Sequence, residues 1–250
     1  MVKHIALRSK SMRNGEKPYT TPGLGDRAHH VLFAYQYAMK HDTEVVLHLT
    51  HDKYGKQHKK DSWRDLTEMA NNKVSIEVWP VANLDENLWL TYLSGKNIDA
   101  SLYYYSDTFG IHPFEEKLGI DAAPYFKVLP CIDPIVKVDL PEKYITVQWD
   151  STDSARSITA DQIELIENKY RDEGYDIITI GGQAEGELKT SLKHIGAALH
   201  GAKYHVGVDS GMMHIAQFYK RWQDIYIHNY GFRSHHFYRA EKNGSHINQL

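Results

Sequence analysis

The stretch YHVGVDSGMMHIAQ, at residues 204–217, decides how the second half of the chain folds. A short apolar run ends at Asp209-Ser210-Gly211, and apolar residues then recur at helical spacing as far as Tyr219. This pattern predicts a strand, a tight turn and a helix, with Ser210 or Asp209 as the N-cap. Such a turn directs backbone N–H groups and the positive end of a helix dipole toward a bound phosphate. The alternative is an ordinary capped turn of an α/β protein.

A second glycine turn lies near the N-terminus, in the stretch GLGDRAH at residues 23–29. It follows an apolar run at residues 3–8 and a polar loop, and it precedes a helical stripe that includes Ala28 and Tyr35 and then an apolar run at residues 45–49. These elements predict a βαβ unit with a glycine turn where a ligand would sit. The turn is not a dinucleotide fingerprint, because it lacks the third glycine and the acidic residue after the second strand.

Taken together, G-D-x-x-H at residues 25–29 and D-S-G-x-x-H at residues 209–214 resemble the two signature turns of the ADP-heptose heptosyltransferase family. The resemblance implies the GT-B fold of that family: α/β, with two Rossmann-like doubly wound domains that face each other across a cleft. The chain is shorter than typical family members, and its N-terminal half lacks elements where the acceptor would bind.

Composition excludes several other classes. The 29 Lys plus Arg residues nearly balance the 32 Asp plus Glu residues, so no basic field favours nucleic acid as a partner. The one cysteine, Cys131, excludes an internal disulfide and a multi-cysteine zinc site and fits a reducing compartment. The 16 histidines show no metal-ligand spacing, so no metal site is predicted. Without a membrane-spanning apolar run or a signal peptide, the sequence predicts a cytoplasmic protein, with peripheral attachment to a membrane left open.

The remaining elements repeat the α/β pattern twice. In the first half we expect a helix at residues 61–71 and strands at 74–79 and 100–105; in the second half, strands at 144–149, 176–180 and 225–227 and a helix at 188–199. Five of the eight prolines lie at residues 112–141, where we place the hinge. The predicted domains are residues 1–128, on the acceptor side, and residues 129–250, which bind the nucleotide sugar. The tail at residues 229–250 has no clear periodicity.

A capping box fixes the start of one helix in the second half. Thr159 and Gln162 have the required spacing, and Ile158 and Ile163 are placed to form a hydrophobic staple. Arg156 therefore lies just before a helix N-terminus. In the resembled family a basic residue of this loop, three positions before the first helical residue, contacts the donor phosphates; Arg156 matches that spacing, although Ile158-Thr159 replaces the usual tryptophan-proline.

The resemblance also assigns roles to residues of the two turns. Asp26 corresponds to the base that deprotonates the acceptor hydroxyl, Asp209 to the residue that holds sugar hydroxyls, and His214 to a residue that lines the donor site. The backbone N–H groups of Ser210, Gly211 and Met212 would contact the diphosphate. His29 also carries over by position, without a defined role. Apart from the assigned roles, Gly25, His29 and Gly182 are candidate cleft residues.

The predicted activity is transfer of a sugar from a nucleoside-diphosphate sugar to the hydroxyl of a glycan, a lipid-linked glycan or another acceptor. Inversion at the anomeric carbon is implied by the family, and no cofactor or metal is expected. Two alternatives remain at this point: a non-catalytic nucleotide-sugar-binding scaffold and a nucleotide-sugar epimerase. Fucosyltransferases and other GT-B enzymes would need an arginine-rich donor site, which the sequence does not show. A nicotinamide-dependent oxidoreductase is disfavoured by the missing fingerprint.

Overall fold

A computed structural model describes residues 2–8, 23–50, 57–79, 91, 94–103, 132–151, 156–228 and 246–247. The chain divides into two compact units, Met1–Ala122 and Ala123–Leu250. The acceptor and donor roles assigned to residues 1–128 and 129–250 remain predictions. Within the described ranges, no helix has both the length and the apolar character needed to cross a membrane.

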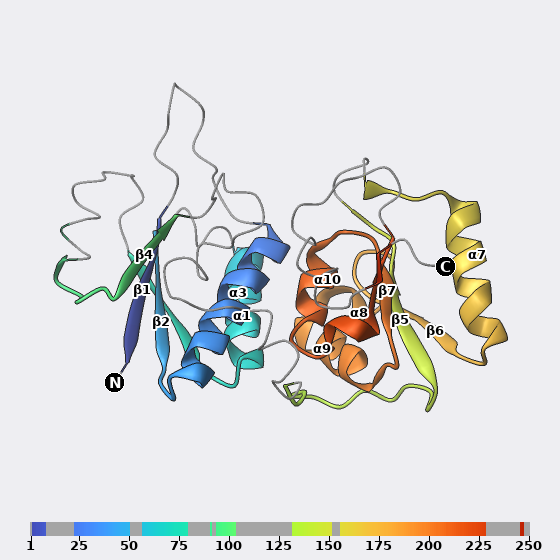
Figure 1. The fold of residues 1–250 in the computed structure, drawn as a ribbon, viewed down its shortest axis with the longest axis horizontal. Helices are drawn as coiled ribbons and strands as arrows, with labels where there is room; N and C mark the ends of the chain where they lie inside the picture. Colours follow the sequence, from blue (N-terminus) through green and yellow to red (C-terminus); the bar gives the residue numbers. More distant parts are fainter. Residues whose placement is uncertain are drawn as a thin grey trace, which may run out of the picture. The chain divides into compact units, whose positions relative to one another are not determined.

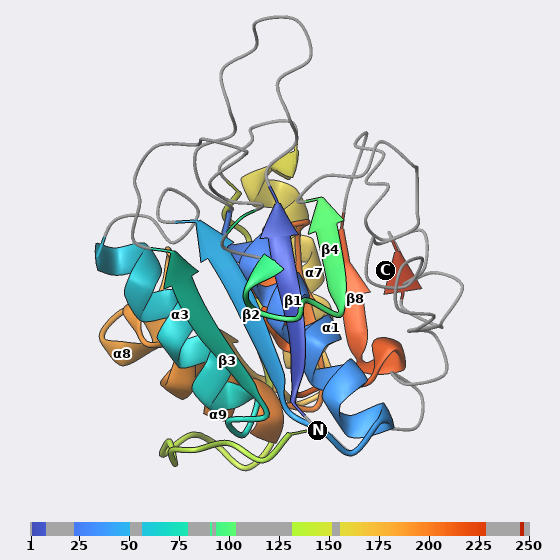
Figure 2. The same cartoon turned by 90° about the vertical axis from the view of Figure 1, so that its left-hand side faces the viewer.

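The first unit contains a parallel sheet with strand order β3-β2-β1-β4. Figure 2 shows these strands side by side, with their arrowheads at one edge. Their bounds are β1, Lys3–Arg8; β2, Val45–Thr50; β3, Val74–Trp79; and β4, Ala100–Tyr103. The chain builds outward from β1 to β3 and then returns to the other side of β1. The strand order therefore reverses between β1 and β4.

Two helices cover one face of this sheet, α1 (Leu24–Lys40) and α3 (Gln57–Met69). Figure 1 shows both on the same side of the strands. The predicted inward stripes are confirmed, because Ala28, Tyr35, Trp63 and Leu66 are all buried. Together with the buried strand residue Leu47, they belong to the apolar core of this unit.

The second unit contains a five-stranded parallel sheet with strand order β6-β5-β7-β8-β9. Helix α7 (Ala160–Asp172) lies on one face, and α8 (Glu187–Thr190), α9 (Leu192–Gly201) and α10 (Gly211–Ala216) lie on the other (Figure 1). A short 3-10 helix, η2 (Trp222–Asp224), precedes β8. The strands are β5, Tyr144–Gln148; β6, Asp176–Thr179; β7, His205–Gly207; β8, Ile225–Ile227; and β9, His246–Ile247. This unit is doubly wound as predicted.

The capping box that fixes the start of α7 is confirmed in full. The Thr159 hydroxyl accepts a hydrogen bond from the Gln162 amide, and the Gln162 side chain accepts one from the Thr159 amide. Ile158 and Ile163 both pack against the core between α7 and the sheet. Arg156 therefore lies three residues before the N-cap of α7.

Several predicted boundaries need correction. Helix α3 begins at Gln57 rather than Asp61, because the lysines and glutamine that suggested a loop are also good helix formers. The helix expected at 188–199 is interrupted at Ser191, whose backbone is extended. The tail at 229–250 contains β9, which is too short to show a periodicity. The strand expected at 100–105 ends at Tyr103, and Tyr104 and Tyr105 lie outside the described residues.

Candidate functional site

The candidate site lies at the carboxyl ends of β5 and β7, two neighbouring strands in the second unit. From β5 the chain moves to β6 on one side and then back to β7 on the other, so the strand order reverses between β5 and β7. In open parallel sheets, ligands bind outside the carboxyl ends of the strands at such a reversal. The loop after β5 leads to Arg156, and the turn after β7 begins with Asp209. The topology therefore brings both predicted donor segments to one place.

Arg156 and His214 both contact Asp209 there. An Arg156 guanidinium nitrogen lies 3.7 Å from a carboxylate oxygen of Asp209 and donates to the Asp209 carbonyl oxygen at 3.4 Å. Nε2 of His214 lies 3.9 Å from the other Asp209 carboxylate oxygen. The Asp209 side chain has no exposed surface, whereas 27% of the Arg156 side chain is exposed. A buried carboxylate thus anchors a guanidinium that still reaches the surface.

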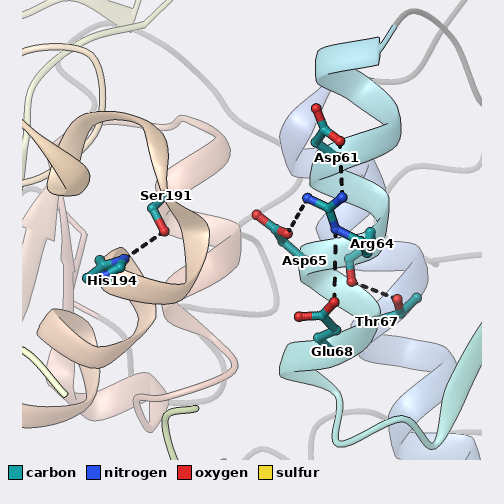
Figure 3. A network of polar contacts seen from close by, with 7 residues as sticks. All are labelled: Asp61, Arg64, Asp65, Thr67, Glu68, Ser191 and His194. Atoms are coloured by element: carbon teal, nitrogen blue, oxygen red, sulfur yellow. Dashed lines mark hydrogen bonds and ion pairs between the residues drawn. The ribbon is translucent and has the colours of Figure 1, made fainter. Parts of the chain in front are cut away.

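Ser210 occupies the predicted N-cap position of α10, but its hydroxyl forms no capping hydrogen bond. The hydroxyl instead donates to Oε1 of Gln148, at the end of β5. Ser191, at the N-cap position of α9, also forms no side-chain cap, and its hydroxyl contacts Nδ1 of His194 one turn along at 2.8 Å (Figure 3). The Ser191 contact is local to one helix, whereas the Ser210 contact joins the turn after β7 to the end of β5. The Ser210 hydroxyl therefore links the Asp209-Ser210-Gly211 turn to the sheet.

Glycines at the end of β6 allow close approach of the neighbouring segments. Gly181 has a positive φ of 79°, and a Cβ atom there would lie 3.2 Å from Cγ of Met212. A Cβ atom on Gly182 would lie 2.6 Å from an Asp150 carboxylate oxygen. Glycine suits position 181 for two reasons. Without a Cβ atom it adopts a positive φ easily, and it leaves room for the Met212 side chain. Met212 and Gly182 thus belong to the same edge as Arg156 and Asp209, and Gly211 is the first residue of α10.

Three predicted residues lie in the first unit, on α1. Gly25 and Asp26 are in its first turn, where the structure describes the backbone of Asp26 but not its side chain. His29 is half-buried and contacts Phe33 edge-on, with ring centroids 5.8 Å apart. The predicted roles of these three residues and the predicted cleft between domains remain predictions.

Sequence reasoning did not single out three polar residues at this edge: Gln148, Asp150 and His228. Gln148 and His228 are buried, and each lies at or just after the carboxyl end of a strand. A polar residue at the end of an apolar strand is the signal that could have identified them. Burial lowers the pKa of His228 to about 4, so its imidazole is neutral at pH 7. Its backbone amide donates to the Gly207 carbonyl at 2.8 Å, which holds it next to β7.

No protein-family model matches the sequence, and no curated protein sequence matches it. The fold is similar to that of TibC, an iron-containing dodecameric glycosyltransferase from enterotoxigenic E. coli, with a TM-score of 0.53 and 13% identity. The alignment covers 91% of this chain and 58% of TibC, so this chain spans less than two thirds of the TibC length. The described parts of the chain therefore share the fold of TibC.

Two further structures are similar at lower scores. The E. coli heptosyltransferase WaaC with ADP has a TM-score of 0.47 and 15% identity, over 91% of this chain and 87% of WaaC. A family 9 glycosyl transferase from Veillonella parvula has a TM-score of 0.46 and 12% identity, over 90% of this chain and 80% of that protein. These two matches are similarities only. The match to TibC confirms the predicted resemblance for the fold, including its parallel α/β sheets. At these identities the likeness concerns the fold alone.

Proposed function

We propose that the protein is a glycosyltransferase that moves a sugar from a nucleoside-diphosphate sugar to an acceptor hydroxyl. One observation carries the proposal: Arg156 and the Asp209-Ser210-Gly211 turn meet where the strand order reverses, between β5 and β7. A bound diphosphate at this place would contact the guanidinium from one side and the turn from the other. The glycosyltransferase fold supports the same proposal.

The chemistry of transfer requires positive charge and hydrogen-bond donors at the leaving diphosphate. Negative charge grows on the diphosphate as the bond to the anomeric carbon breaks, and fixed donors stabilise it best. Arg156 would supply the formal positive charge. The backbone N–H groups of residues 210–212 would add donors, since the Ser210 hydroxyl bonds to Gln148 rather than capping α10. Helix α10 has only six residues, so we assign the larger electrostatic share to Arg156.

The proposed roles of Asp209 and His214 follow from their contacts. Asp209 holds Arg156 and His214 in place through its two carboxylate oxygens. For its second proposed role, the contact with sugar hydroxyls, one of these oxygens must turn toward the ligand. His214 would line the donor site beside it. Neutral or charged, the imidazole offers a donor to a sugar or phosphate oxygen.

Asp26 is the proposed base on the acceptor side. A carboxylate within hydrogen-bond reach of the acceptor hydroxyl would take its proton as the hydroxyl attacks the anomeric carbon. Attack on the face opposite the diphosphate inverts the configuration of that carbon. We expect Asp26→Ala to abolish transfer while nucleoside-diphosphate affinity stays within a few fold of the wild type. Unchanged turnover in Asp26→Ala would reject Asp26 as the base.

Independence of a metal is part of the proposal. Among the described residues, no three His, Cys, Asp or Glu side chains come together as a metal-binding group. Arg156 and the turn would take the electrostatic role that a divalent cation has in other transferases. Transfer that survives EDTA supports this role, whereas transfer that EDTA stops and a divalent metal restores contradicts it.

A ligand screen tests the function. The purified protein is mixed with ADP, GDP, UDP or CDP and with their common sugar conjugates, with and without EDTA, and its melting temperature is measured. A ligand that binds only the folded state raises the melting temperature. At a free ligand concentration of about 100 times Kd, it stabilises the folded protein by roughly 2.7 kcal/mol. Binding followed by transfer to an added glycan or lipid-linked glycan supports the proposal.

Three other results would each contradict the proposed transfer. Binding without turnover of any acceptor would indicate a non-catalytic nucleotide-sugar-binding protein. Conversion of the donor in the absence of an acceptor would indicate an epimerase. A protein that binds none of the nucleotides would have kept the fold for another ligand.

A further inference from the structure

Gln148 stands at the centre of the candidate site although it was not among the predicted residues. It is the last residue of β5, and only 4% of its surface is exposed. Its side-chain amide nitrogen donates to the Asp150 carbonyl, in the loop that leads to Arg156. Its side-chain carbonyl oxygen accepts the Ser210 hydroxyl, in the turn after β7. One side chain therefore bonds to both segments of the site.

The backbone around Gln148 is equally close to its neighbours. Gln148 pairs with Gly207 of β7, and its carbonyl accepts the Val208 amide at 3.1 Å. A Cβ atom on Gly207 would collide with that carbonyl, and one on Gly181 would lie 3.4 Å from Cγ of Gln148. The residue is thus packed between the ends of β6 and β7.

We propose that Gln148 is a positioning residue that holds Asp150, which precedes Arg156 in the chain, and the Ser210 turn at the separation needed by a bound diphosphate. Glutamine suits this place because its amide offers a donor and an acceptor in one planar group. Leucine has a similar volume and offers neither. Glutamate keeps the acceptor but, when ionised, cannot donate to the Asp150 carbonyl. The diphosphate in this inference rests on the proposed function, whereas the coupling of the two segments does not.

The same pair of strands supplies a matched control. Thr146 lies two residues earlier on β5, on the same face, and is fully buried. Its hydroxyl contacts Nδ1 of His205 on β7 at 3.1 Å. Thr146→Val therefore removes a buried side-chain contact of β5, as Gln148→Leu does, but one that joins β5 to β7 and lies farther from the carboxyl edge. General loosening of the sheet would affect both variants, whereas loss of positioning would affect Gln148→Leu alone.

The first measurement is affinity for the nucleoside diphosphate that the wild type binds best. We expect Gln148→Leu to weaken that affinity at least about fivefold, since a lost buried hydrogen bond changes an equilibrium by this factor or more. Thr146→Val should leave the affinity within twofold. In Gln148→Glu, the affinity relative to the wild type should recover as the pH falls, because the protonated acid regains an O–H donor. Equal loss in the Leu and Val variants, or no loss in either, would overturn the inference.

The second measurement needs no ligand. Amide hydrogen exchange compares the peptide that covers residues 208–214 in the wild type, Gln148→Leu and Thr146→Val. We expect exchange there to be at least about fivefold faster in Gln148→Leu only. If the wild type binds no diphosphate, the proposed function fails, and this exchange result still decides whether Gln148 positions the turn. Unchanged exchange in Gln148→Leu would overturn the positioning itself. If Gln148→Leu does not fold, the same comparison is made with Gln148→Glu.

Discussion

Two arginines of this protein, Arg64 and Arg156, have contrasting surroundings. Arg64 lies on α3, 59% of its side chain is exposed, and carboxylates of the same helix surround it (Figure 3). Its nitrogens lie 3.3 Å from an Asp61 oxygen, 3.4 Å from Asp65 and 3.9 Å from Glu68. Arg156 is largely buried at a sheet edge, beside the fully buried Asp209.

The difference shows which arginine surroundings indicate a ligand-binding site. Exposed helical ion pairs form between residues three and four apart, cost little to desolvate and contribute little to stability. A guanidinium beside a buried carboxylate has lost part of its hydration, so each contact it keeps is stronger. A sheet edge holds such a pair only if surrounding contacts offset that cost. Arg156 is therefore the arginine that we expect a ligand to use.

The largest expected effect is on ligand affinity. Arg156→Ala should weaken nucleoside-diphosphate affinity by about 10- to 100-fold, since a hydrogen bond to a charged group contributes roughly 1.5–3 kcal/mol. Arg64→Ala removes the same side chain from α3 and should leave the affinity unchanged. Isothermal titration of both variants checks the difference. Equal affinities in the two variants would remove Arg156 from the proposed site.

The second prediction is a difference of about tenfold between two affinities, one for the nucleotide sugar and one for the diphosphate alone. Asp209→Asn keeps the size of the side chain but removes the charge that faces Arg156 and His214. If Asp209 also holds sugar hydroxyls, affinity for the nucleotide sugar should fall about tenfold more than affinity for the diphosphate alone, an amount equal to one hydrogen bond to a charged group. Parallel titrations with both ligands measure the ratio. A ratio near one would limit Asp209 to holding Arg156 in place.

A third effect concerns pH and buried histidines in both units. Burial lowers the pKa of His205 in the second unit to about 3 and that of His48 in the first unit to about 4. In the unfolded chain these histidines bind protons as the pH falls through about 6.5, whereas in the folded chain they stay neutral to lower pH. Each histidine's contribution to the free energy of unfolding is therefore complete above pH 6.5 and lost as the pH falls, by up to about 1.4 kcal/mol per pH unit.

Urea denaturation between pH 7.5 and 4.5 measures this loss. His205→Asn keeps a polar atom near the Thr146 hydroxyl but cannot titrate, so its stability should fall less steeply toward low pH than that of the wild type. His48→Gln gives the matching test in the first unit. Parallel curves for the wild type and both variants would show that these histidines do not set the acid sensitivity.

The smallest effect is expected at Arg64 itself. Glu68→Gln removes the carboxylate at 3.9 Å, one turn along α3, and should lower the free energy of unfolding by about 0.3–0.5 kcal/mol, the usual value for such a pair. The loss should shrink as salt is added. A loss several times larger would mean that the Arg64 cluster has more than a surface role.

Local patterns predicted much of the fold. The capping box at Thr159 and the inward stripes of α1 and α3 depend on residues a few positions apart, so the sequence contains all that is needed. Boundaries were less certain where side chains suit two conformations, as at Gln57 and Ser191. The two residues of β9 could not be predicted, because the neighbouring β8 makes them a strand.

The candidate site was predicted in part for the same reason. The sequence by itself determined that Asp209-Ser210-Gly211 turns from strand to helix and that Arg156 precedes a capped helix, since both are local patterns. Tertiary structure alone decided that these segments, more than fifty residues apart, meet between β5 and β7. It also decided that Gln148 bonds to both and that the Ser210 hydroxyl faces the sheet rather than its own helix. Strand order and side-chain burial arise from contacts between distant residues, and no local pattern contains them.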